Sequence, residues 1–222
     1  MGKRRLRLLS ALLPGGILAG IDAREDRRRE AEERYGAKTF ASLDEAMSIR
    51  PQAVFICTPP LTHAEAIYEC LTRNLHVFTE INLVDRGYAE NSALAQKLGL
   101  TLFLSSTPLY RREPRYLIEQ TAQRSGALVY RYHVGQYLPD WHPWETYQSF
   151  FVGDARTNGC REIFAINLPW ILRAFGLVAR GLLGLGLAPG EDPLQVRQRR
   201  EDHRHAPAFL ARGRIHLRDV LE

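Results

Sequence analysis

The side chains best suited to ligand recognition lie between Gly135 and Tyr147, in the sequence GQYLPDWHPWETY. This segment holds two tryptophans, two tyrosines, two carboxylates and one imidazole, and its apolar residues follow neither a helical nor a strand period. Aromatic rings stack on the C–H faces of sugars, while carboxylates and imidazoles hydrogen-bond to hydroxyl groups. The segment therefore predicts a sugar-binding loop. Its candidate substrate-binding residues are Asp140, Trp141, His142, Trp144 and Tyr147.

Two further interpretations of this loop stay open. His142 is also a candidate catalytic residue, because an imidazole can transfer protons near neutral pH. The other interpretation is structural, with Trp141 and Trp144 holding a plug between domains or between subunits.

Two apolar runs, Ala53–Cys57 and Leu75–Thr79, flank one amphipathic helix. The helix is predicted to begin near Thr62, with Thr62 as its N-cap and Glu65 at the capping-box position. Strand, helix and strand in this order predict a right-handed βαβ unit, and such units bind small ligands at the carboxyl ends of their strands. The residues at those ends are Thr58-Pro59-Pro60 and Glu80-Ile81-Asn82.

These strand ends resemble two signatures of the Gfo/Idh/MocA family, the relatives of glucose-fructose oxidoreductase and inositol dehydrogenase. In that family one strand ends in T-P-x-x-x-H and the next in E-K-P. The first signature is present as Thr58, Pro59 and His63, and the glutamate of the second is Glu80. The resemblance implies an NAD(P)-binding domain with these four residues at the cofactor. The family's lysine, which lies beside the nicotinamide and the substrate hydroxyl, is replaced by Ile81.

A second group of candidate cofactor residues follows the predicted strand Ile17–Ile21. Asp22 stands just beyond it, where dinucleotide folds place an acid that accepts hydrogen bonds from the ribose hydroxyls. Asp22 could instead cap the helix that starts near Ala23. Arg24 could meet the 2′-phosphate of NADP or be an ordinary surface arginine, so NAD and NADP both stay open.

The first residues resemble the end of the family's glycine loop. Gly2 is followed by Lys3-Arg4-Arg5-Leu6 and by a helix predicted over Met1–Leu13, but neither a strand nor a G-x-G-x-x-G precedes it. The expected fold is therefore α/β, a Rossmann-like doubly wound parallel sheet lacking its first strand. Gly2 is a candidate cofactor residue with a reduced set of backbone amides for the pyrophosphate.

The second half resembles the family's substrate domain. Tyr110-Arg111-Arg112-Glu113-Pro114 resembles the signature that joins the two halves, and it adds Tyr110 and Arg111 to the candidate substrate-binding residues. Composition changes at Ser125, and Leu128–Tyr137 alternates like a strand. The expected division is an NAD(P)-binding domain over 1–124 and a partial α+β domain over 125–222. The latter would carry a mainly antiparallel sheet, including a hairpin over 206–217, and an exposed edge that favours a homo-oligomer.

The family's catalytic helix corresponds to Asn158–Phe175. Its D-x-x-x-H pattern falls on Ile163 and Asn167, neither of which can relay a proton, so Asn167 is predicted only to bind substrate. Glu162 could supply a carboxylate with a shift of one residue and is a candidate catalytic residue. Hydride transfer from an alcohol needs a base, and losing it costs roughly 10²–10⁴ in rate.

Charge, cysteine spacing and apolar runs limit which partners and metal sites are expected for this chain. The net charge is +5, but basic residues alternate with acids, so no nucleic acid is expected. The three cysteines have neither metal-ligand nor C-x-x-C spacing, which favours reduced thiols in a cytoplasmic protein without a metal site. No apolar run is long enough to span a membrane.

Three functions are consistent with these residues. The first is an NAD(P)-dependent oxidoreductase of the sugar or sugar-nucleotide type, shortened at both ends relative to the family and impaired in catalysis. The second is a non-catalytic relative that serves binding or assembly. The third is an unrelated α/β binding protein.

Overall fold

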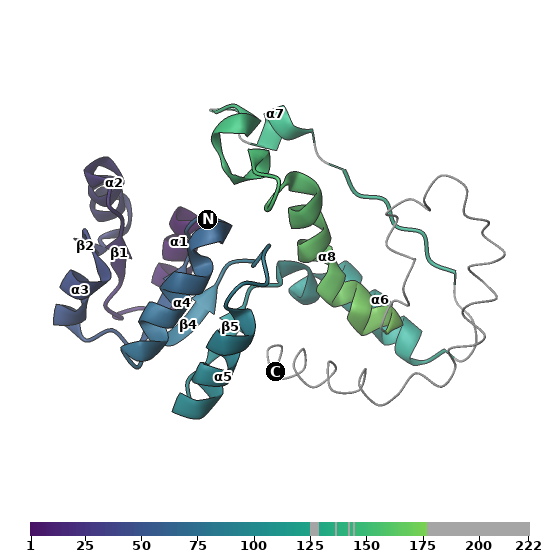
Figure 1. Ribbon diagram of the computed structural model, residues 1–222, viewed down its shortest axis with the longest axis horizontal. Coiled ribbons are helices and arrows are strands. Elements are labelled where there is room, and N and C mark those ends of the chain that lie inside the picture. Colours follow the sequence, from purple (N-terminus) through teal and green to yellow (C-terminus); the bar gives the residue numbers. More distant parts are fainter. Residues whose placement is uncertain (125–128, 136, 142, 144, 177–222) are drawn as a thin grey trace. The chain divides into compact units, whose positions relative to one another are not determined.

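The computed structural model describes residues 1–124, 129–135, 137–141, 143 and 145–176. They fall into two units (Figure 1). The first comprises Met1–Ser105 with His142–Asn158, and the second comprises Ser106–Trp141 with the chain from Gly159 onward. The sequence assigned residues 1–124 to the first domain, and that boundary stays a prediction.

Helices and strands alternate along the first unit, as expected for an α/β fold. They are α1 (Gly2–Leu12), β1 (Ala19–Ile21), α2 (Glu25–Tyr35), β2 (Lys38–Phe40), α3 (Leu43–Ala46), β3 (Ala53–Ile56), α4 (His63–Thr72), β4 (His76–Thr79), α5 (Tyr88–Leu98) and β5 (Leu102–Leu104). The short 3₁₀ helices of this unit are Met47–Ile49, Pro60–Thr62, Tyr147–Ser149 and Phe151–Gly153. Every strand pair described is parallel, which confirms the predicted Rossmann-like arrangement.

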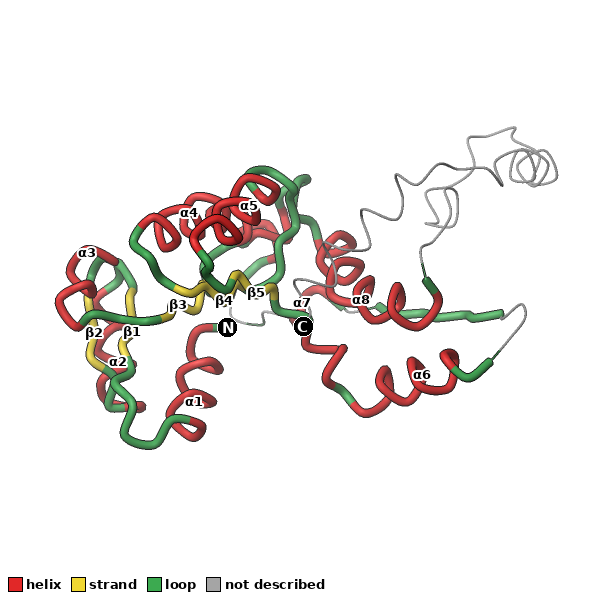
Figure 2. The backbone as a smooth tube through the Cα atoms, turned by 90° about the horizontal axis from the view of Figure 1, so that it is seen from below, coloured by secondary structure: helices red, strands yellow, loops and turns green. Residues whose placement is uncertain are grey.

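The two faces of the sheet β3–β4–β5 are packed differently. Its buried face packs against α4 and α5 in a core that includes Ile56, Leu71 and Val77. The other face carries Phe55, Phe78 and Phe103, which the parallel register places side by side. Their ring centroids are 4.8 and 5.4 Å apart. Figure 2 shows α4 and α5 on one side of this sheet and α1 on the other.

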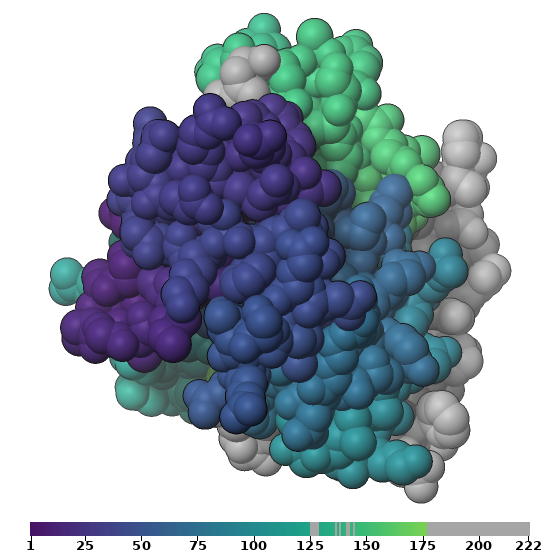
Figure 3. Space-filling model, turned by 90° about the vertical axis from the view of Figure 1, so that its left-hand side faces the viewer, coloured from purple at the N-terminus to yellow at the C-terminus, as the bar shows by residue number. Residues whose placement is uncertain are grey.

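The strands do not form one continuous sheet. Among the described strands, β1 pairs only with β2, whereas β3 pairs with β4 and β4 with β5. Helix α1 contacts α2 on one side and β3 on the other, and Lys3 Nζ lies 2.6 Å from Glu30 Oε2 of α2. On the face shown in Figure 3, the purple N-terminal segments adjoin the blue and teal segments that follow. The two sheets therefore belong to one packed unit with an interruption between β1 and β3.

One helix cap differs from its prediction. The residues Pro60–Thr62 form a 3₁₀ turn and α4 begins at His63, with no capping bond from the Thr62 side chain. The Thr62 hydroxyl instead lies 2.9 Å from both Thr58 Oγ1 and Pro59 O. The predicted capping box is wrong because this hydroxyl closes the turn that precedes the helix.

The regular elements described in the second unit are all helices. Its elements are a 3₁₀ helix η3 (Thr107–Tyr110), α6 (Arg112–Ala122), α7 (Leu138–Trp141) and α8 (Gly159–Phe175). Helix α8 packs against α6 and η3. None of the helices described in either unit has the length and apolar character needed to cross a bilayer.

The predicted strand over Leu128–Tyr137 is wrong for residues 129–135, which have no regular secondary structure. Alternation arises here because Tyr130 and Tyr132 both pack against α8. The ring of each meets Trp170 edge-on, at centroid distances of 6.0 and 5.4 Å. The hairpin predicted over 206–217 lies outside the described residues, so the antiparallel sheet and assembly through it stay predictions.

Candidate functional site

The carboxyl ends of β3, β4 and β5 meet at one edge of the sheet, and Arg5 of α1 reaches it. Arg5 Nε donates to Glu80 Oε1 over 2.6 Å, and Arg5 Nη2 donates to Ser105 Oγ over 3.1 Å. The guanidinium carbon lies 4.7 Å from the centroid of the Phe78 ring. The side chains of Arg5 and Glu80 are only 16% and 13% exposed, so solvent screens this ion pair little. The predicted cofactor residue Glu80 is thus neutralised within the unit.

Cys57 lies beside the same carboxylate. Its Sγ is 4.0 Å from Glu80 Oε1, and burial, followed by the charge of Glu80, raises the pKa of the thiol to about 11. The thiol is therefore protonated at neutral pH and is a weak hydrogen-bond donor rather than a nucleophile. Gly2, another predicted cofactor residue, begins α1 next to Cys57.

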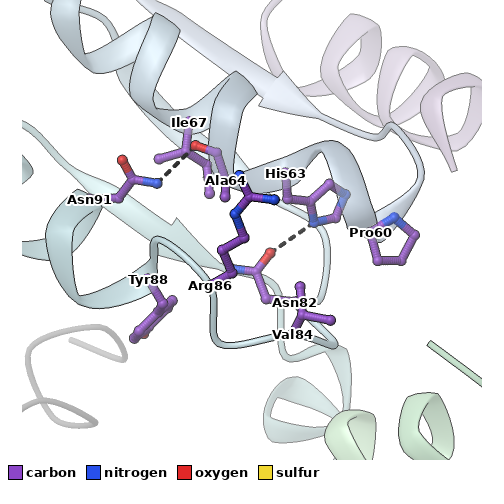
Figure 4. Close-up of a pocket in the computed structure, with 9 residues that line it drawn as sticks. All are labelled: Pro60, His63, Ala64, Ile67, Asn82, Val84, Arg86, Tyr88 and Asn91. Carbon is purple, nitrogen blue, oxygen red and sulfur yellow. Dashed lines mark hydrogen bonds between the residues drawn. The ribbon is translucent and has the colours of Figure 1, made fainter. Parts of the chain in front are cut away.

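The side chain of His63 connects the residues that follow β3 with those that follow β4 (Figure 4). Its ring is 2% exposed, with Nδ1 2.8 Å from Asn82 Oδ1 and Nε2 2.8 Å from Thr58 O. A backbone carbonyl only accepts, so Nε2–H donates to Thr58 O. Nδ1 of a neutral ring then accepts, which requires the amide of Asn82 to present its NH₂ group, an orientation interchangeable with the one drawn.

The surroundings of His63 leave no room for a ligand. The adjoining cavity has a volume of about 10 Å³, enough for about one water molecule. The residues that line it are Pro60, His63, Ala64, Ile67, Asn82, Val84, Arg86, Tyr88 and Asn91 (Figure 4). His63 therefore acts on a ligand only by fixing the loops that carry Thr58 and Asn82, whereas Thr58 and Pro59 themselves are exposed.

The side chains of Asp22 and Arg24 form hydrogen bonds and ion pairs at the start of α2. Asp22 Oδ1 accepts from the backbone N–H of Arg24 over 2.9 Å, and Arg27 Nη1 lies 3.3 Å from Asp22 Oδ2. Arg24 Nε donates to Asp26 Oδ1 over 3.0 Å. The carboxylate of Asp22 thus shapes the turn before the helix, and its second oxygen keeps only a long contact. The ion pair of Arg24 is exposed and therefore weak.

Asn167, in the middle of α8, uses both ends of its amide. Its Oδ1 accepts from Tyr132 Oη over 2.9 Å and from Trp170 Nε1 over 3.1 Å, while its Nδ2 donates to Ile163 O over 2.7 Å. These bonds hold the aromatic cluster against the helix. Little hydrogen-bonding capacity is left for the predicted contact with substrate.

Glu162, in the first turn of α8, has the most strongly shifted pKa among the carboxyl groups described in this unit. Burial raises the pKa of its carboxyl from the usual 4.5 to about 7. Its Oε2 is shielded from solvent and has no hydrogen-bond partner among the residues described. A carboxyl that titrates near neutrality can act as a general acid or base.

The remaining predicted substrate residues that the structure describes are all exposed. Tyr110, 61% exposed, lines an open groove of about 310 Å³ along α6, and Arg111 is exposed beside it. Asp140 and Tyr147 are exposed and belong to different units. The residues His142 and Trp144 and the side chain of Trp141 lie outside what the structure describes. The described part of the chain holds no cluster of three or more potential metal ligands.

The chain matches known proteins over its first unit. Residues 1–103 match the family model GFO_IDH_MocA, described as "Oxidoreductase family, NAD-binding Rossmann fold". This part of the chain matches the Gfo/Idh/MocA family. The predicted resemblance is confirmed, and the predicted cofactor class agrees with the family's description as NAD-binding.

Two inositol 2-dehydrogenases are similar Gfo/Idh/MocA relatives. The one from Rubrobacter xylanophilus is 30% identical over 131 residues, which are 58% of this chain and 38% of that enzyme. The one from Renibacterium salmoninarum is 36% identical over 75 residues, 33% of this chain and 23% of that enzyme. The chain thus spans well under half the length of these relatives.

A solved structure of this family also matches the fold. The WlbA dehydrogenase from Bordetella pertussis, in complex with NADH and UDP-GlcNAcA, superimposes with a TM-score of 0.51 at 17% identity. The match covers 55% of this chain and 38% of that chain. At this identity the comparison supports the fold alone.

Three residues at the strand ends of the first unit were not predicted from the sequence. Arg5 lies in a basic run that gives no hint of a buried partner, and Ser105 only ends a strand. Asn82 could have been predicted, because it directly follows Glu80 and Ile81 at the position of the proline of E-K-P, and an amide there can bond to a buried imidazole.

Proposed function

We propose that this chain binds a nicotinamide dinucleotide in the manner of its family and is impaired in the hydride transfer that the family performs on sugars or sugar nucleotides. The observation that carries this proposal is Asn167, which stands at the family's histidine position. Its amide cannot take up a proton, and both of its ends are already bonded to Tyr132, Trp170 and Ile163.

Cofactor binding is supported by the strand ends of the first unit. Thr58 and Pro59 are exposed at the end of β3, on a loop that His63 fixes to Asn82. Neutralisation of Glu80 by Arg5 removes a charge that would repel a pyrophosphate. The loosely held Oδ2 of Asp22 can accept a ribose hydroxyl.

Impaired catalysis follows from the side chains at the family's proton-transfer positions. Ile81 replaces the lysine, and Ile163 and Asn167 replace the aspartate and histidine. None of them can accept the proton of a substrate hydroxyl, and loss of a general base lowers rates by roughly 10²–10⁴. If no hydride transfer remains at all, the chain serves binding or assembly alone.

The proposed substrate class is polyhydroxylated, because two of the similar relatives, matched over 131 and 75 residues, are inositol 2-dehydrogenases. The loop over 135–147 and the pair Tyr110 and Arg111 supply aromatic and polar groups for such a ligand. A sugar nucleotide would add stacking of its base on an exposed tyrosine.

A direct test titrates the full chain with NADH and with NADPH while following nicotinamide fluorescence. We expect saturable binding of at least one of them. The same protein, incubated with NAD or NADP and either myo-inositol or a UDP-sugar, is expected to form no reduced cofactor. Turnover would refute the impairment, and absence of binding would refute the cofactor assignment.

A second candidate function is favoured by Glu162. Its carboxyl has a pKa of about 7 and a shielded oxygen without a partner in the described structure, as a general base requires. An active oxidoreductase could therefore use Glu162 in place of the usual residues. In that case Glu162→Gln abolishes a turnover that the wild-type chain shows, and the rate depends on a group with a pKa near 7.

A further inference from the structure

Helix α6 has one packed side and one exposed side. Its half-buried residues include, at helical spacing on one side, Pro114, Leu117, Ile118 and Thr121. The helix packs against α8, which lies along α6 in Figure 2, and these residues supply the side that is covered. The opposite side of α6 lines the open groove of about 310 Å³ that also includes Tyr110.

The residues of α6 that line this groove occupy successive positions of one helix face. They are Arg112, Arg115, Tyr116 and Glu119, at positions i, i+3, i+4 and i+7. All four residues are exposed. A volume of about 310 Å³ is at the lower end of the range for small-molecule sites, which is ~300–1,000 Å³. The groove is therefore large enough for a small organic ligand.

Two positive charges in the groove are available to a ligand. Among the described residues, neither Arg112 nor Arg115 has an ion-pair or side-chain hydrogen-bond partner. Arg112 is also the first residue of α6, where the helix dipole adds a partial positive charge. A guanidinium group binds phosphate oxygens through two parallel N–H donors. The end of the groove at the start of α6 therefore attracts a phosphate or diphosphate group.

The other residues of the groove suit a nucleoside. The rings of Tyr110 and Tyr116 are more than half exposed, and an exposed ring can stack on a nucleobase. Glu119 follows Arg112 by about 10 Å along the helix, at about 1.5 Å per residue. Its carboxylate repels phosphates but accepts hydrogen bonds from ribose hydroxyls. The groove thus has a cationic end and a hydroxyl-accepting end, with Tyr116 between them.

We propose that this groove on α6 binds a nucleoside diphosphate. Arg112 and Arg115 bind the two phosphates. Tyr116 stacks on the base, and Glu119 accepts hydrogen bonds from the ribose. A simple anion would leave the ring and the carboxylate unused, and an uncharged sugar would leave both guanidinium groups without a counter-charge. The lining residues of α6 all belong to the second unit, so this inference goes beyond nicotinamide binding and does not require it.

Calorimetric titration of the full chain with UDP, in the absence of nicotinamide cofactors, tests the site. We expect saturable binding with a Kd of about 1 mM or lower. Uridine and pyrophosphate each present one half of the ligand and should bind at least about tenfold more weakly than UDP. UDP-glucose should bind about as tightly as UDP, because the open groove leaves room beyond the second phosphate.

Matched variants locate the bound UDP. Arg115→Gln should weaken UDP binding at least about tenfold, whereas Arg124→Gln, at an exposed position beyond the end of α6, should leave it unchanged. Tyr116→Leu should weaken UDP binding at least about fivefold and leave pyrophosphate binding unchanged. Its control is Tyr68→Leu on α4, a tyrosine of nearly the same exposure. All four residues are exposed, so these variants are expected to fold, which melting curves check.

Absence of saturable UDP binding would refute the proposal. Pyrophosphate bound as tightly as UDP would refute the nucleoside contacts, because the groove would then be a simple anion site. Full UDP affinity in Arg115→Gln would place UDP elsewhere and would also overturn the proposal. UDP-glucose bound more than about tenfold more weakly than UDP would contradict the orientation of the diphosphate.

A titration of Arg115→Gln with NADH separates this inference from the proposed function. Loss of UDP binding with unchanged NADH binding is the expected result. Equal loss of both ligands would contradict a separate site on α6. A wild-type chain that binds UDP in the expected manner but does not bind NADH or NADPH would refute only the proposed function.

Discussion

Arg5 Nε lies 2.6 Å from Glu80 Oε1, which ties the first turns of α1 to the end of β4 across 75 positions of sequence. The same guanidinium covers the Phe78 ring and donates to Ser105 Oγ. One side chain thus links a helix, the aromatic face of the sheet and two strand ends. Any ligand at this edge meets a charge that is already compensated.

Removing this arginine is expected to destabilise the chain. Arg5→Met leaves the poorly exposed carboxylate of Glu80 without its partner, which we expect to lower the free energy of unfolding by about 1–3 kcal/mol. Urea unfolding followed by circular dichroism measures this. Arg4→Met, on the exposed side of the same helix, is the control and should change stability by less than about 0.5 kcal/mol. The double variant Arg5→Met/Glu80→Gln should recover part of the lost stability. Equal losses of stability in Arg5→Met and Arg4→Met would contradict a stabilising role of the Arg5–Glu80 ion pair.

His63 is expected to contribute more to the free energy of unfolding than an ordinary polar residue does. His63→Ala removes two hydrogen bonds and leaves a cavity, which together cost about 2–4 kcal/mol. Asn82→Ala removes one of those bonds and should cost about 1–2 kcal/mol. The exposed His76, whose Nδ1 accepts from Thr101 N over 3.0 Å, is the control, and His76→Ala should cost less than about 1 kcal/mol. Additive effects of the His63 and Asn82 variants would show that the two side chains do not interact.

Local sequence pattern predicted the βαβ unit well because its determinants are local. Apolar runs of four residues, Pro59 and Pro60 as breakers and a helical period suffice to locate β3, α4 and β4. The Arg5–Glu80 pair could not be predicted, since it depends on how α1 packs against the strand ends. Residues 129–135 do not form the strand expected around Tyr130 and Tyr132, because the rings of these two tyrosines pack against Trp170 of a helix and not against a sheet, and they stay 36% and 44% exposed.

The carboxyl of Glu162 is expected to make stability depend on pH. Because burial raises its pKa from 4.5 to about 7, the folded chain binds a proton that the unfolded chain has lost between these values. The stabilisation of the protonated form is complete below about pH 4.5 and is lost as pH rises through 7. Glu162→Gln should therefore be more stable than the wild type at pH 8 and similar to it at pH 5. Melting curves across this range measure the difference, with Glu119→Gln, at an exposed position of α6, as the control. Parallel pH profiles of Tm for Glu162→Gln and the wild type would contradict the prediction.

Asp22 and Arg24 allow a test of cofactor type. Asp22→Asn should weaken NADH binding about tenfold, because a hydrogen bond to a charged acceptor contributes about 1.5 kcal/mol or more. Arg24→Ala should leave NADH binding unchanged and weaken NADPH binding if a 2′-phosphate is recognised. Fluorescence titrations give both constants, and Asp26→Asn, which alters the partner of Arg24 alone, is the control. Unchanged binding in Asp22→Asn would exclude the predicted contact with the ribose.

Restoring the family's lysine alone is not expected to create an active dehydrogenase. Ile81→Lys supplies a cation at the strand end, but the proton of the substrate hydroxyl still has no acceptor at Asn167, whose amide is bonded to Tyr132 and Trp170. Formation of reduced cofactor from NAD and myo-inositol should stay at the level of a blank without protein. Ile81→Met is the control for changes in packing at the same position. Activity in Ile81→Lys alone would mean that another group, with Glu162 the first to examine, accepts the proton, and Ile81→Lys/Glu162→Gln would then lose that activity again.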